Sequence, residues 1–195
     1  MIVEPVVLMG KHVRLEPLSE AHIPGLSVAG GDPSIWRYML YGEVTSEEKM
    51  ADWVRDILSR KATGTDQPFA VIQLSSGRVA GATRYMEIRP AHRGLEIGGT
   101  WYGKEFQRTP VNTETKYLLL RHAFEVLGCI RVQLKTDLRN ERSQKAIERL
   151  GAVREGVLRN HMIVDGGVYR HSVYYSILDK EWPPVKARLE DLLAK

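Results

Sequence analysis

Hydrophobic and polar residues alternate along several stretches of the chain with the two-residue period of half-buried strands. This pattern predicts strands at residues 12–17, 68–74, 79–88, 95–102, 130–136, 153–164 and 168–178. Elsewhere, apolar residues recur at the three- to four-residue spacing of a helix that faces a core. That spacing predicts helices at 19–28, from Thr45 through at least Ile57, at 113–127, at 141–150, and around Val185, Leu189 and Leu192 near the C-terminus.

The residues at the ends of these segments agree with the assignment. Thr45 and Glu48 have the spacing of a capping box, in which two side chains satisfy free backbone N–H groups at a helix start. Gly128 and Gly151 follow two of the predicted helices, at the position where glycine commonly ends a helix. The run Asp165-Gly166-Gly167 is a turn signal between the last two strands.

The order of elements predicts the class of fold. Consecutive strands joined by short turns favour an antiparallel meander. One step, from strand 95–102 through helix 113–127 to strand 130–136, predicts a parallel crossover, which is a natural place for a ligand cleft. No linker or repeat interrupts the pattern, so we predict a single domain over residues 1–195. Its class is α/β (α+β), with a mixed, mostly antiparallel sheet flanked by helices.

Composition and charge narrow the class of protein. Hydrophobic residues make up 43% and charged residues 27%, which is typical of soluble globular domains and excludes disordered and collagen-like chains. The 28 Lys and Arg against 24 Asp and Glu leave a net charge of +4, which favours an anionic ligand but is too small to indicate nucleic acid. The N-terminus lacks the pattern of a signal peptide, and no apolar run is long enough to cross a bilayer. We therefore expect a cytoplasmic protein.

The segment between strand 95–102 and helix 113–127 has the chemistry of an anion site. A helix N-terminus presents free backbone N–H groups and a partial positive charge. Arg108 adds a full charge, and polar side chains add hydrogen bonds. The alternative is an ordinary capped helix, with Asn112 or Thr113 as the cap and Pro110 setting the turn.

A second polar pair opens the helix 141–150. Asn140 and Ser143 are three residues apart and therefore share one helical face beside strand 130–136. The alternative is that Asn140 only caps the helix and Ser143 only lies in its first turn.

Glu96 is the candidate general base. It lies in strand 95–102 just before Gly98 and Gly99, and paired glycines in a strand often mark a bulge or a close approach by a ligand. The alternative is a surface glutamate at a sheet edge. Glu105 is a second candidate, better explained as a solvated loop residue, and Cys129 is expected to be a core residue at a strand start.

Other chemistry finds little support in the residues. The six histidines have no metal-site spacing, and no motif of a phosphate-binding loop, a dinucleotide fold or a nucleophile elbow occurs. We therefore expect no metal. Trp36, Tyr38 and Tyr41 cluster in one region, where they wall a substrate pocket or form a small satellite core.

Taken together, these features resemble the GNAT family of acyl-CoA-dependent N-acetyltransferases, and within it the Rim-type branch of ribosomal-protein N-terminal acetyltransferases. Residues 10–18 are similar to that branch's first strand, and Leu95-Glu96-Ile97-Gly98 to a later one. The most specific stretch is 140–156, where the Asn-x-x-Ser start and the Leu-Gly-Ala end match the family's late helix and the strand after it. The resemblance covers nearly the whole chain.

The resemblance implies a fold and a donor site. In the family, two neighbouring central strands splay apart and acyl-CoA lies in the resulting V, with its pyrophosphate on the loop that opens the central helix. The implied pantetheine contacts are the backbone of Thr100, Trp101 and Tyr102 together with Asn140, and Ser143 is implied near the thioester sulfur. The implied phosphate loop is Gln107, Arg108, Thr109, Pro110, Val111 and Asn112, leading into Thr113.

The phosphate loop departs from the family pattern. The branch carries Gln-Gly-x-Gly-x-Ala, whereas this chain has Arg108 and Pro110 at the glycine positions and Asn112 at the final small position. Pro110 removes one N–H donor, and we expect Arg108 to compensate through its charge.

The reaction implied is transfer of an acetyl group from acetyl-CoA to a primary amine, with Glu96 as base, a backbone N–H near Trp101 or Tyr102 holding the oxyanion, and Ser143 assisting the thiolate. The resemblance suggests a protein N-terminal α-amine as acceptor and a homodimer as assembly. Trp36, Arg37, Tyr38 and Tyr41 are expected to line the acceptor side. The alternatives are a small-molecule amine, a larger acyl donor, and a non-catalytic acyl-CoA-binding module.

Overall fold

Eight strands form one sheet in the computed structural model, which describes residues 1–194 and, at Asp165, the backbone only. The strands are β1 (Leu8–Met9), β2 (Val13–Pro17), β3 (Gln67–Gln73), β4 (Val79–Arg89), β5 (Gly94–Tyr102), β6 (Arg131–Asp137), β7 (Val153–Val164) and β8 (Val168–Leu178). Their order is β1-β2-β3-β4-β5-β6-β8-β7. Neighbouring described strands are antiparallel except β5 and β6, which are parallel, as the predicted crossover requires.

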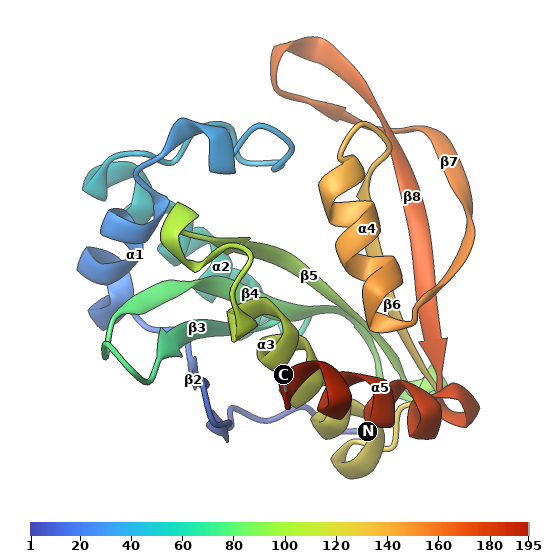
Figure 1. Cartoon of the computed structure of the whole chain (residues 1–195). Helices are drawn as coiled ribbons and strands as arrows, with labels where there is room; N and C mark the ends of the chain where they lie inside the picture. The colour runs from blue at the N-terminus through green and yellow to red at the C-terminus, as the bar shows by residue number, and fades with distance from the viewer. Residues whose placement is uncertain (195) are drawn as a thin grey trace.

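Helices cover the two faces of this sheet unequally (Figure 1). They are α1 (Ile23–Gly30), α2 (Glu47–Ala62), α3 (Pro110–Arg121), α4 (Glu141–Leu150) and α5 (Trp182–Leu193). On one face, α1 packs on β4 and α2 packs on β3. On the other face, α3, α4 and α5 share the main core with the sheet. No described helix occupies the first face beside β6 and β8.

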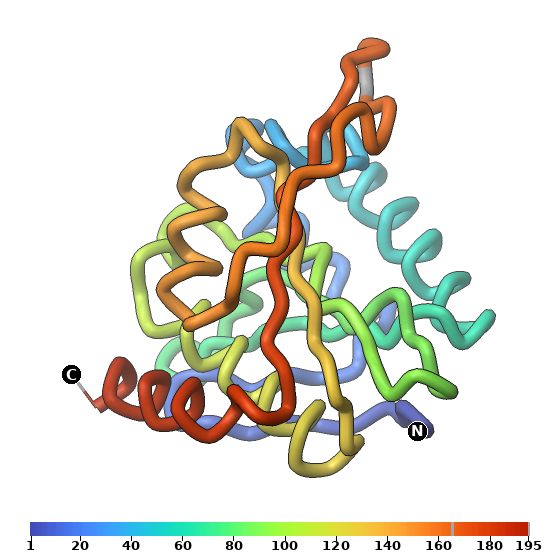
Figure 2. The backbone as a smooth tube through the Cα atoms, turned by 90° about the vertical axis from the view of Figure 1, so that its right-hand side faces the viewer, coloured from blue at the N-terminus to red at the C-terminus, as the bar shows by residue number. Residues whose placement is uncertain are grey.

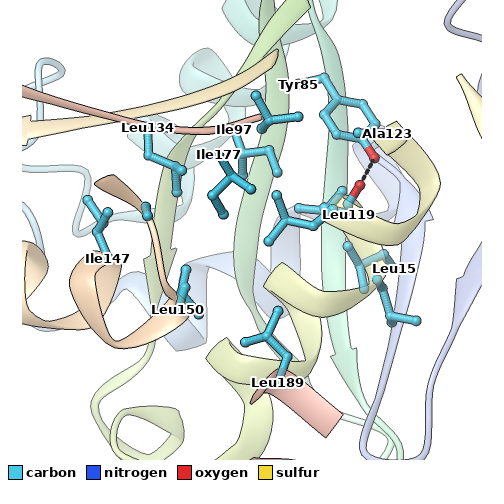
Figure 3. Close-up of a cluster of buried hydrophobic side chains, with 14 of the residues drawn as sticks. Leu15, Tyr85, Ile97, Leu119, Ala123, Leu134, Ile147, Leu150, Ile177 and Leu189 are labelled. Carbon is cyan, nitrogen blue, oxygen red and sulfur yellow. Dashed lines mark hydrogen bonds between the residues drawn. The ribbon is translucent and has the colours of Figure 1, made fainter. Parts of the chain in front are cut away.

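The main core fills the space between the sheet and the three later helices (Figure 3). Ile97, Leu134 and Ile177 come from three neighbouring strands and point to this side, as the strand alternation demands. The hydroxyl of buried Tyr85 donates to the backbone carbonyl of Leu119 at 2.7 Å, so the one polar atom of this ring is satisfied inside the core. A smaller core lies under α1 and α2.

The predicted strands all form, each within one residue of the predicted bounds, whereas β1 was not predicted. The helix 141–150 has the predicted bounds, and Gly151 ends it with a positive φ of 101°. The helix predicted at 113–127 begins earlier, at Pro110, and its last turn, His122–Val126, is a π-turn. The predicted cap of α2 was wrong by one residue: the hydroxyl of Ser46, not of Thr45, accepts from the Lys49 N–H at 3.2 Å.

The last two strands form a long hairpin that extends beyond the rest of the molecule (Figure 2). Its turn is the predicted run of residues 165–167, where Gly166 and Gly167 both adopt a φ of 74°. Strand β7 is the edge of the sheet, and β8 lies between it and β6.

Glu114 in α3 fastens the N-terminal hairpin to the central helix. Its Oε1 accepts from the backbone N–H of Lys11 at 2.8 Å, and its Oε2 accepts from those of His12 at 2.6 Å and Val13 at 2.7 Å. The carboxylate fits because Gly10 has no Cβ, which would lie 2.4 Å from the Glu114 carboxyl carbon. Charge-assisted bonds to buried N–H groups are stronger than neutral ones, so this contact joins segments about a hundred residues apart.

Replacing Glu114 by Gln is expected to lower the free energy of unfolding by about 2–3 kcal/mol, because the amide nitrogen cannot accept and a buried N–H loses its partner. Urea denaturation followed by circular dichroism measures the effect. Glu4→Gln, at an exposed position, is the matched control and is expected to unfold with the wild type. Equal midpoints for the two variants would contradict this role for Glu114.

Candidate active site

Strands β5 and β6 pair over only three positions and then separate. Gly94, Leu95 and Glu96 pair with Arg131, Val132 and Gln133, and no pairing follows. From residue 97 to residue 102, the edge of β5 that faces β6 therefore has no strand partner, and the two strands open into a V (Figure 1). Unpaired backbone groups at such an edge are a template for an extended ligand.

A bulge lies in the unpaired part of β5. The register with β4 shifts between Ala82 and Arg84, opposite Gly98 to Trp101, and Gly99 adopts a positive φ of 58°. Bulges bend a strand and sit often beside functional sites. The bulge also sends the side chains of Trp101 and Tyr102 into the two cores, so only the backbone of these residues is available to the V.

The segment that opens α3 lies at the mouth of this V. Its cap is Thr109, not Asn112 or Thr113 as the capping alternative predicted: the Thr109 hydroxyl accepts from the Val111 N–H at 3.3 Å. Pro110 occupies the first helical position, where a missing N–H removes only a donor that has no partner within the helix. Asn112 and Thr113 lie in the first turn.

Arg108 adopts a positive φ of 61°, the left-handed conformation that favours glycine. The position where the family has glycine thus keeps a glycine-like backbone in this chain, although it carries a long cationic side chain. The departure at Arg108 therefore leaves the shape of the turn intact. An arginine in this conformation carries strain that a glycine would not.

Two side-chain contacts join this segment to α4 across the mouth of the V. Gln107 donates from Nε2 to the Tyr102 carbonyl at 3.0 Å and accepts from Arg142 at 2.6 Å. Arg149 donates to the Thr113 hydroxyl at 2.7 Å. Both arginines therefore lie beside the N-terminus of α3.

Asn140 and Ser143 lie together at the start of α4, as predicted. The Asn140 Oδ1 accepts from the Ser143 N–H at 3.1 Å, which is the contact of a helix cap. This bond uses the side-chain oxygen of Asn140, and within the described residues its amide nitrogen and the Ser143 hydroxyl make no hydrogen bond. Capping and ligand binding are thus compatible at this pair.

Glu96 is buried at the base of the V, with 1% of its surface exposed. Its Oε2 accepts from Gln133 at 2.8 Å and from Lys135 at 3.1 Å, and Gln133 in turn accepts from Arg89 at 3.0 Å. The ion pair offsets the cost of burying a carboxylate. Within residues 1–194 no donor reaches Oε1, which lies beside Gly98, where an added Cβ would approach it to 2.8 Å. The surface alternative for Glu96 was wrong, because the register of β5 and β6 places this face inside.

A row of polar residues on β6 and β8 continues from Glu96 and was not predicted. Lys135 lies 5.9 Å from the ring centroid of Tyr174, whose hydroxyl lies 3.3 Å from His161 Nε2. His161 Nδ1 lies 2.9 Å from the hydroxyl of Ser172. Burial, followed by the charges of Lys135 and Arg170, lowers the pKa of His161. The signal in the sequence was the alternation of polar residues at 170, 172, 174 and 176, which indicates a polar face but not its burial.

The three aromatic residues expected on the acceptor side divide into two groups. Trp36 is a core residue: it is buried against Trp101, at 4.9 Å between ring centroids, and its Nε1 donates to the Gly30 carbonyl. Tyr41 accepts from Arg84 at 2.8 Å and lies close to Gly99. The Tyr38 carbonyl accepts from Arg170 in β8 at 3.2 Å. We call the part of the sheet face beside β6 and β8 that no described helix covers the open face. Tyr38 and Tyr41 therefore border the open face, and Trp36 does not.

Other candidates lie away from the V. Glu105 is exposed and pairs with Arg78. Cys129 is a core residue, as predicted, and burial raises the pKa of its thiol to about 11.

Among the residues that the structure describes, no group of three or more His, Cys, Asp and Glu side chains is placed to hold a metal ion. No helix within residues 1–194 has the length and apolar character needed to cross a membrane.

Lys116 on α3 is a buried charge that sequence reasoning missed. Its Nζ donates to the Thr100 hydroxyl at 2.6 Å, and that oxygen lies 2.8 Å from the Thr83 hydroxyl. No described carboxylate pairs with it, and burial lowers its pKa to about 7. Lys116 lies one turn into the predicted helix. That this position faces the sheet becomes visible only once α3 is packed on β5.

The chain belongs to the GNAT family of acetyltransferases: the acetyltransferase (GNAT) domain matches residues 12–153. The resemblance depended on residues 10–18, 95–98 and 140–156, most of which lie inside the matched range. The protein is accordingly an N-acetyltransferase of a family that uses acetyl-CoA.

Individual relatives match the chain to different extents. The chain is 34% identical over 109 residues to YdaF of Bacillus subtilis (strain 168), which is named as a ribosomal N-acetyltransferase; the match spans 56% of this chain and 58% of that protein. A crystal structure of an acetyltransferase from T. thermophilus is 44% identical, with a TM-score of 0.90 over 99% of this chain and 100% of that one. RimJ of Mycobacterium smegmatis, in complex with CoA-disulfide, shares the fold at 18% identity, with a TM-score of 0.81 over 96% and 95% of the two chains.

Lys116→Met is expected to stabilise the protein near pH 7 and to flatten its stability at higher pH. A lysine whose pKa falls from 10.5 to about 7 on folding is protonated in the unfolded chain and neutral in the folded one between these values. The unfolded state therefore binds more protons, so this group makes stability rise from pH 7 to pH 10.5, by an amount on the order of 5 kcal/mol over the whole window.

Urea denaturation at pH 7 and at pH 9.5 measures the difference. The wild type is expected to gain stability relative to Lys116→Met between these two pH values. Lys180→Met, at an exposed position, is the control and is expected to follow the wild type. Parallel pH profiles for all three proteins would show that Lys116 does not titrate in this range.

Proposed function

We propose that the protein transfers an acetyl group from acetyl-CoA to a primary amine by direct attack in the V between β5 and β6. The observation that carries this proposal is the unpaired edge of β5, which begins beside the buried carboxylate of Glu96. In the step, the amine nitrogen attacks the thioester carbonyl and a C–N bond forms. The C–S bond then breaks, CoA leaves as the thiolate, and the amine proton is removed.

The residues at the V fit the donor. The pantetheine arm would pair with the backbone of Thr100, Trp101 and Tyr102 and with the free amide nitrogen of Asn140. The pyrophosphate would lie on the backbone N–H groups at the start of α3, from Gln107 through Thr113, where the helix dipole favours negative charge. Arg108 would add its guanidinium there, since its exposed side chain has no partner among the described residues.

Glu96 is the proposed base. Its two oxygens have separate tasks: Oε2 is held by Gln133 and Lys135, and Oε1 is left to take a proton, directly or through one water. A carboxylate held in one position by two donors loses little freedom when it accepts the proton. A backbone N–H of β5 near Trp101 or Tyr102 would hold the oxyanion of the tetrahedral intermediate.

Ser143 is the proposed partner of the leaving sulfur. Its hydroxyl makes no hydrogen bond within the described residues and lies at the first turn of α4, where N–H groups also favour an anion. A hydroxyl is a weak acid, but a thiolate is a good leaving group, so a hydrogen bond to the sulfur is sufficient.

The proposed acceptor is the N-terminal α-amine of a protein. The support is the name of the Bacillus subtilis relative and the fold shared with RimJ. Tyr38 and Tyr41, beside the open face, would line the acceptor's path. A small-molecule amine and a larger acyl donor are the alternatives within the enzyme class, and a non-catalytic acyl-CoA-binding module is the alternative outside it. A cytoplasmic homodimer is part of the same proposal.

Glu96→Gln is expected to lower kcat by about 10²–10³-fold, because general base catalysis contributes amounts of this size. Binding of acetyl-CoA should stay within about twofold of the wild type, since the amide keeps the size of the carboxylate. Release of the CoA thiol, in the presence of a lysine-free peptide with a free α-amine or of small primary amines, measures the rate. Ser143→Ala is expected to lower kcat by about tenfold through loss of one hydrogen bond.

Glu190→Gln, which changes an exposed carboxylate on α5, is the control and should retain the wild-type rate. Unchanged kcat in both Glu96→Gln and Ser143→Ala would overturn the assigned roles. A wild-type protein that binds acetyl-CoA but acetylates none of the amines would favour the binding module.

Arg108→Gly is expected to weaken acetyl-CoA binding by about tenfold, which corresponds to one charge-assisted contact. Glycine keeps the left-handed turn, so the variant removes the charge without straining the backbone. Thermal melting with and without acetyl-CoA measures binding, because a ligand of the folded state adds about 2.7 kcal/mol at a hundredfold excess over Kd.

Arg108→Lys retains the charge and is expected to lie between the wild type and Arg108→Gly. A wild-type melting temperature that does not move at millimolar acetyl-CoA would count against the donor site. An equal shift in the wild type and Arg108→Gly would show that this guanidinium does not contact the donor.

A further inference from the structure

Arg170 in β8 is a buried cation without a carboxylate partner. Its exposed fraction is 6%, and its Nε donates to the Ser172 hydroxyl at 3.2 Å while its Nη1 donates to the Tyr38 carbonyl at 3.2 Å. Its Nη2 has no acceptor among the described residues. The Ser172 hydroxyl and the Tyr38 carbonyl are both neutral, so no negative charge contacts the Arg170 guanidinium.

The neighbouring cations on the same face are compensated. Lys135 lies 3.1 Å from Glu96, and Arg139 pairs with Asp137 at 2.7 Å. Asp137 and Glu96 also act on Arg170, but only at longer range, and no described carboxylate lies within ion-pair distance of it. Both nearby carboxylates are thus already engaged with another cation.

An unpaired buried charge is expensive, because it loses its hydration and gains no opposite charge in return. Burial lowers the pKa of Arg170, the direction expected when a charged form loses its solvation. The guanidinium nevertheless stays protonated, because arginine has the highest reference pKa of the side chains. Because such a charge costs stability, its presence on the same sheet face as the proposed base points to a role in binding a ligand.

The register of the sheet places Arg170 and Glu96 on the same face. Glu96 pairs with Gln133, and Gln133 pairs with Ser176, so the three side chains share one face. Along β8, alternate residues keep that face, which leads from Ser176 to Arg170. This face carries no described helix beside β6 and β8 and is bordered by Tyr38.

We propose that Arg170 binds a carboxylate of the acceptor whose amine lies at Glu96, so that the preferred acceptor is an amine that also carries an acid. The inference rests on the proposed function and adds the class of acceptor. A carboxylate would supply the missing counter-charge through Nη2 and Nη1, in the bidentate geometry that a guanidinium favours. The Tyr38 carbonyl would give up its bond in exchange.

Two sources have this chemistry, and the experiment separates them. A small amino acid is represented by 5-aminopentanoate, with 5-aminopentanamide as its neutral partner. A protein N-terminus is represented by two lysine-free peptides that differ only in Asp or Asn at the second residue and carry an amidated C-terminus. Initial rates of CoA release from acetyl-CoA give kcat/KM for each acceptor with the wild type, Arg170→Gln and Arg170→Lys.

For the pair that represents the true source, we expect the acidic member to exceed its neutral partner at least tenfold in the wild type, mainly through KM. Arg170→Gln should bring this ratio close to one, because only the acidic member uses the charge. Arg170→Lys should keep part of the ratio. Arg121→Gln, on the far side of the sheet in α3, is the control and should keep all of it.

A ratio near one for both wild-type pairs overturns the inference, as does a preference that survives in Arg170→Gln. Acetyl-CoA binding without turnover of any of the four amines also overturns it, while the donor half of the proposed function stands. Absence of acetyl-CoA binding overturns the proposed function itself.

Thermal melting distinguishes a role of Arg170 in stability from a role in acceptor binding. A residue held for structure would lower the melting temperature when replaced, whereas an uncompensated buried charge should not. Arg170→Met is therefore expected to melt no lower than the wild type. A clear loss of melting temperature in Arg170→Met, together with an unchanged acceptor ratio in Arg170→Lys, would assign Arg170 a structural role.

Discussion

The short parallel pairing of β5 with β6 is the constraint on which the rest of the site depends. Three paired positions hold the two strands together at Glu96, and beyond them the sheet opens and leaves backbone groups of β5 without partners. Buried backbone donors and acceptors are nearly always satisfied in proteins. An opening of this kind is therefore stable only at a place that water or a ligand can reach, and we propose acetyl-CoA as that ligand.

Packing on either side holds the opening in shape. Leu95 and Ile97 anchor β5 in the main core, while Trp101 anchors it in the smaller core on the other face, across the bulge at Gly99. Because one strand is held from both faces, its unpaired edge stays extended without a neighbour. Glu114 ties α3, whose first turn lies at the mouth of the V, to the N-terminal hairpin, so the loop at Arg108 is presented by a firmly held helix.

Charge is distributed unevenly around this opening. On the open face, Glu96 and Asp137 each hold a cation, and Arg170 is left without a carboxylate of its own. On the helical face, Lys116 is buried with only hydroxyl groups beside it. Buried charges without counter-ions reduce stability. Their concentration next to the V fits the general tendency of binding sites to carry features that the fold alone would not favour.

The sequence by itself determined the elements, their order and most of their ends, because period, caps and turn glycines are local properties. It also pointed to Glu96, Asn140 and Ser143 through their neighbours in the chain. Only the tertiary structure decided which of these face one another. Register across β5, β6 and β8 buried Glu96, joined it to Lys135 and set Arg170 on the same face, while packing sent Trp36 into a core. Contacts between residues tens of positions apart leave no local pattern, so the spacing of residues in the sequence could not predict them.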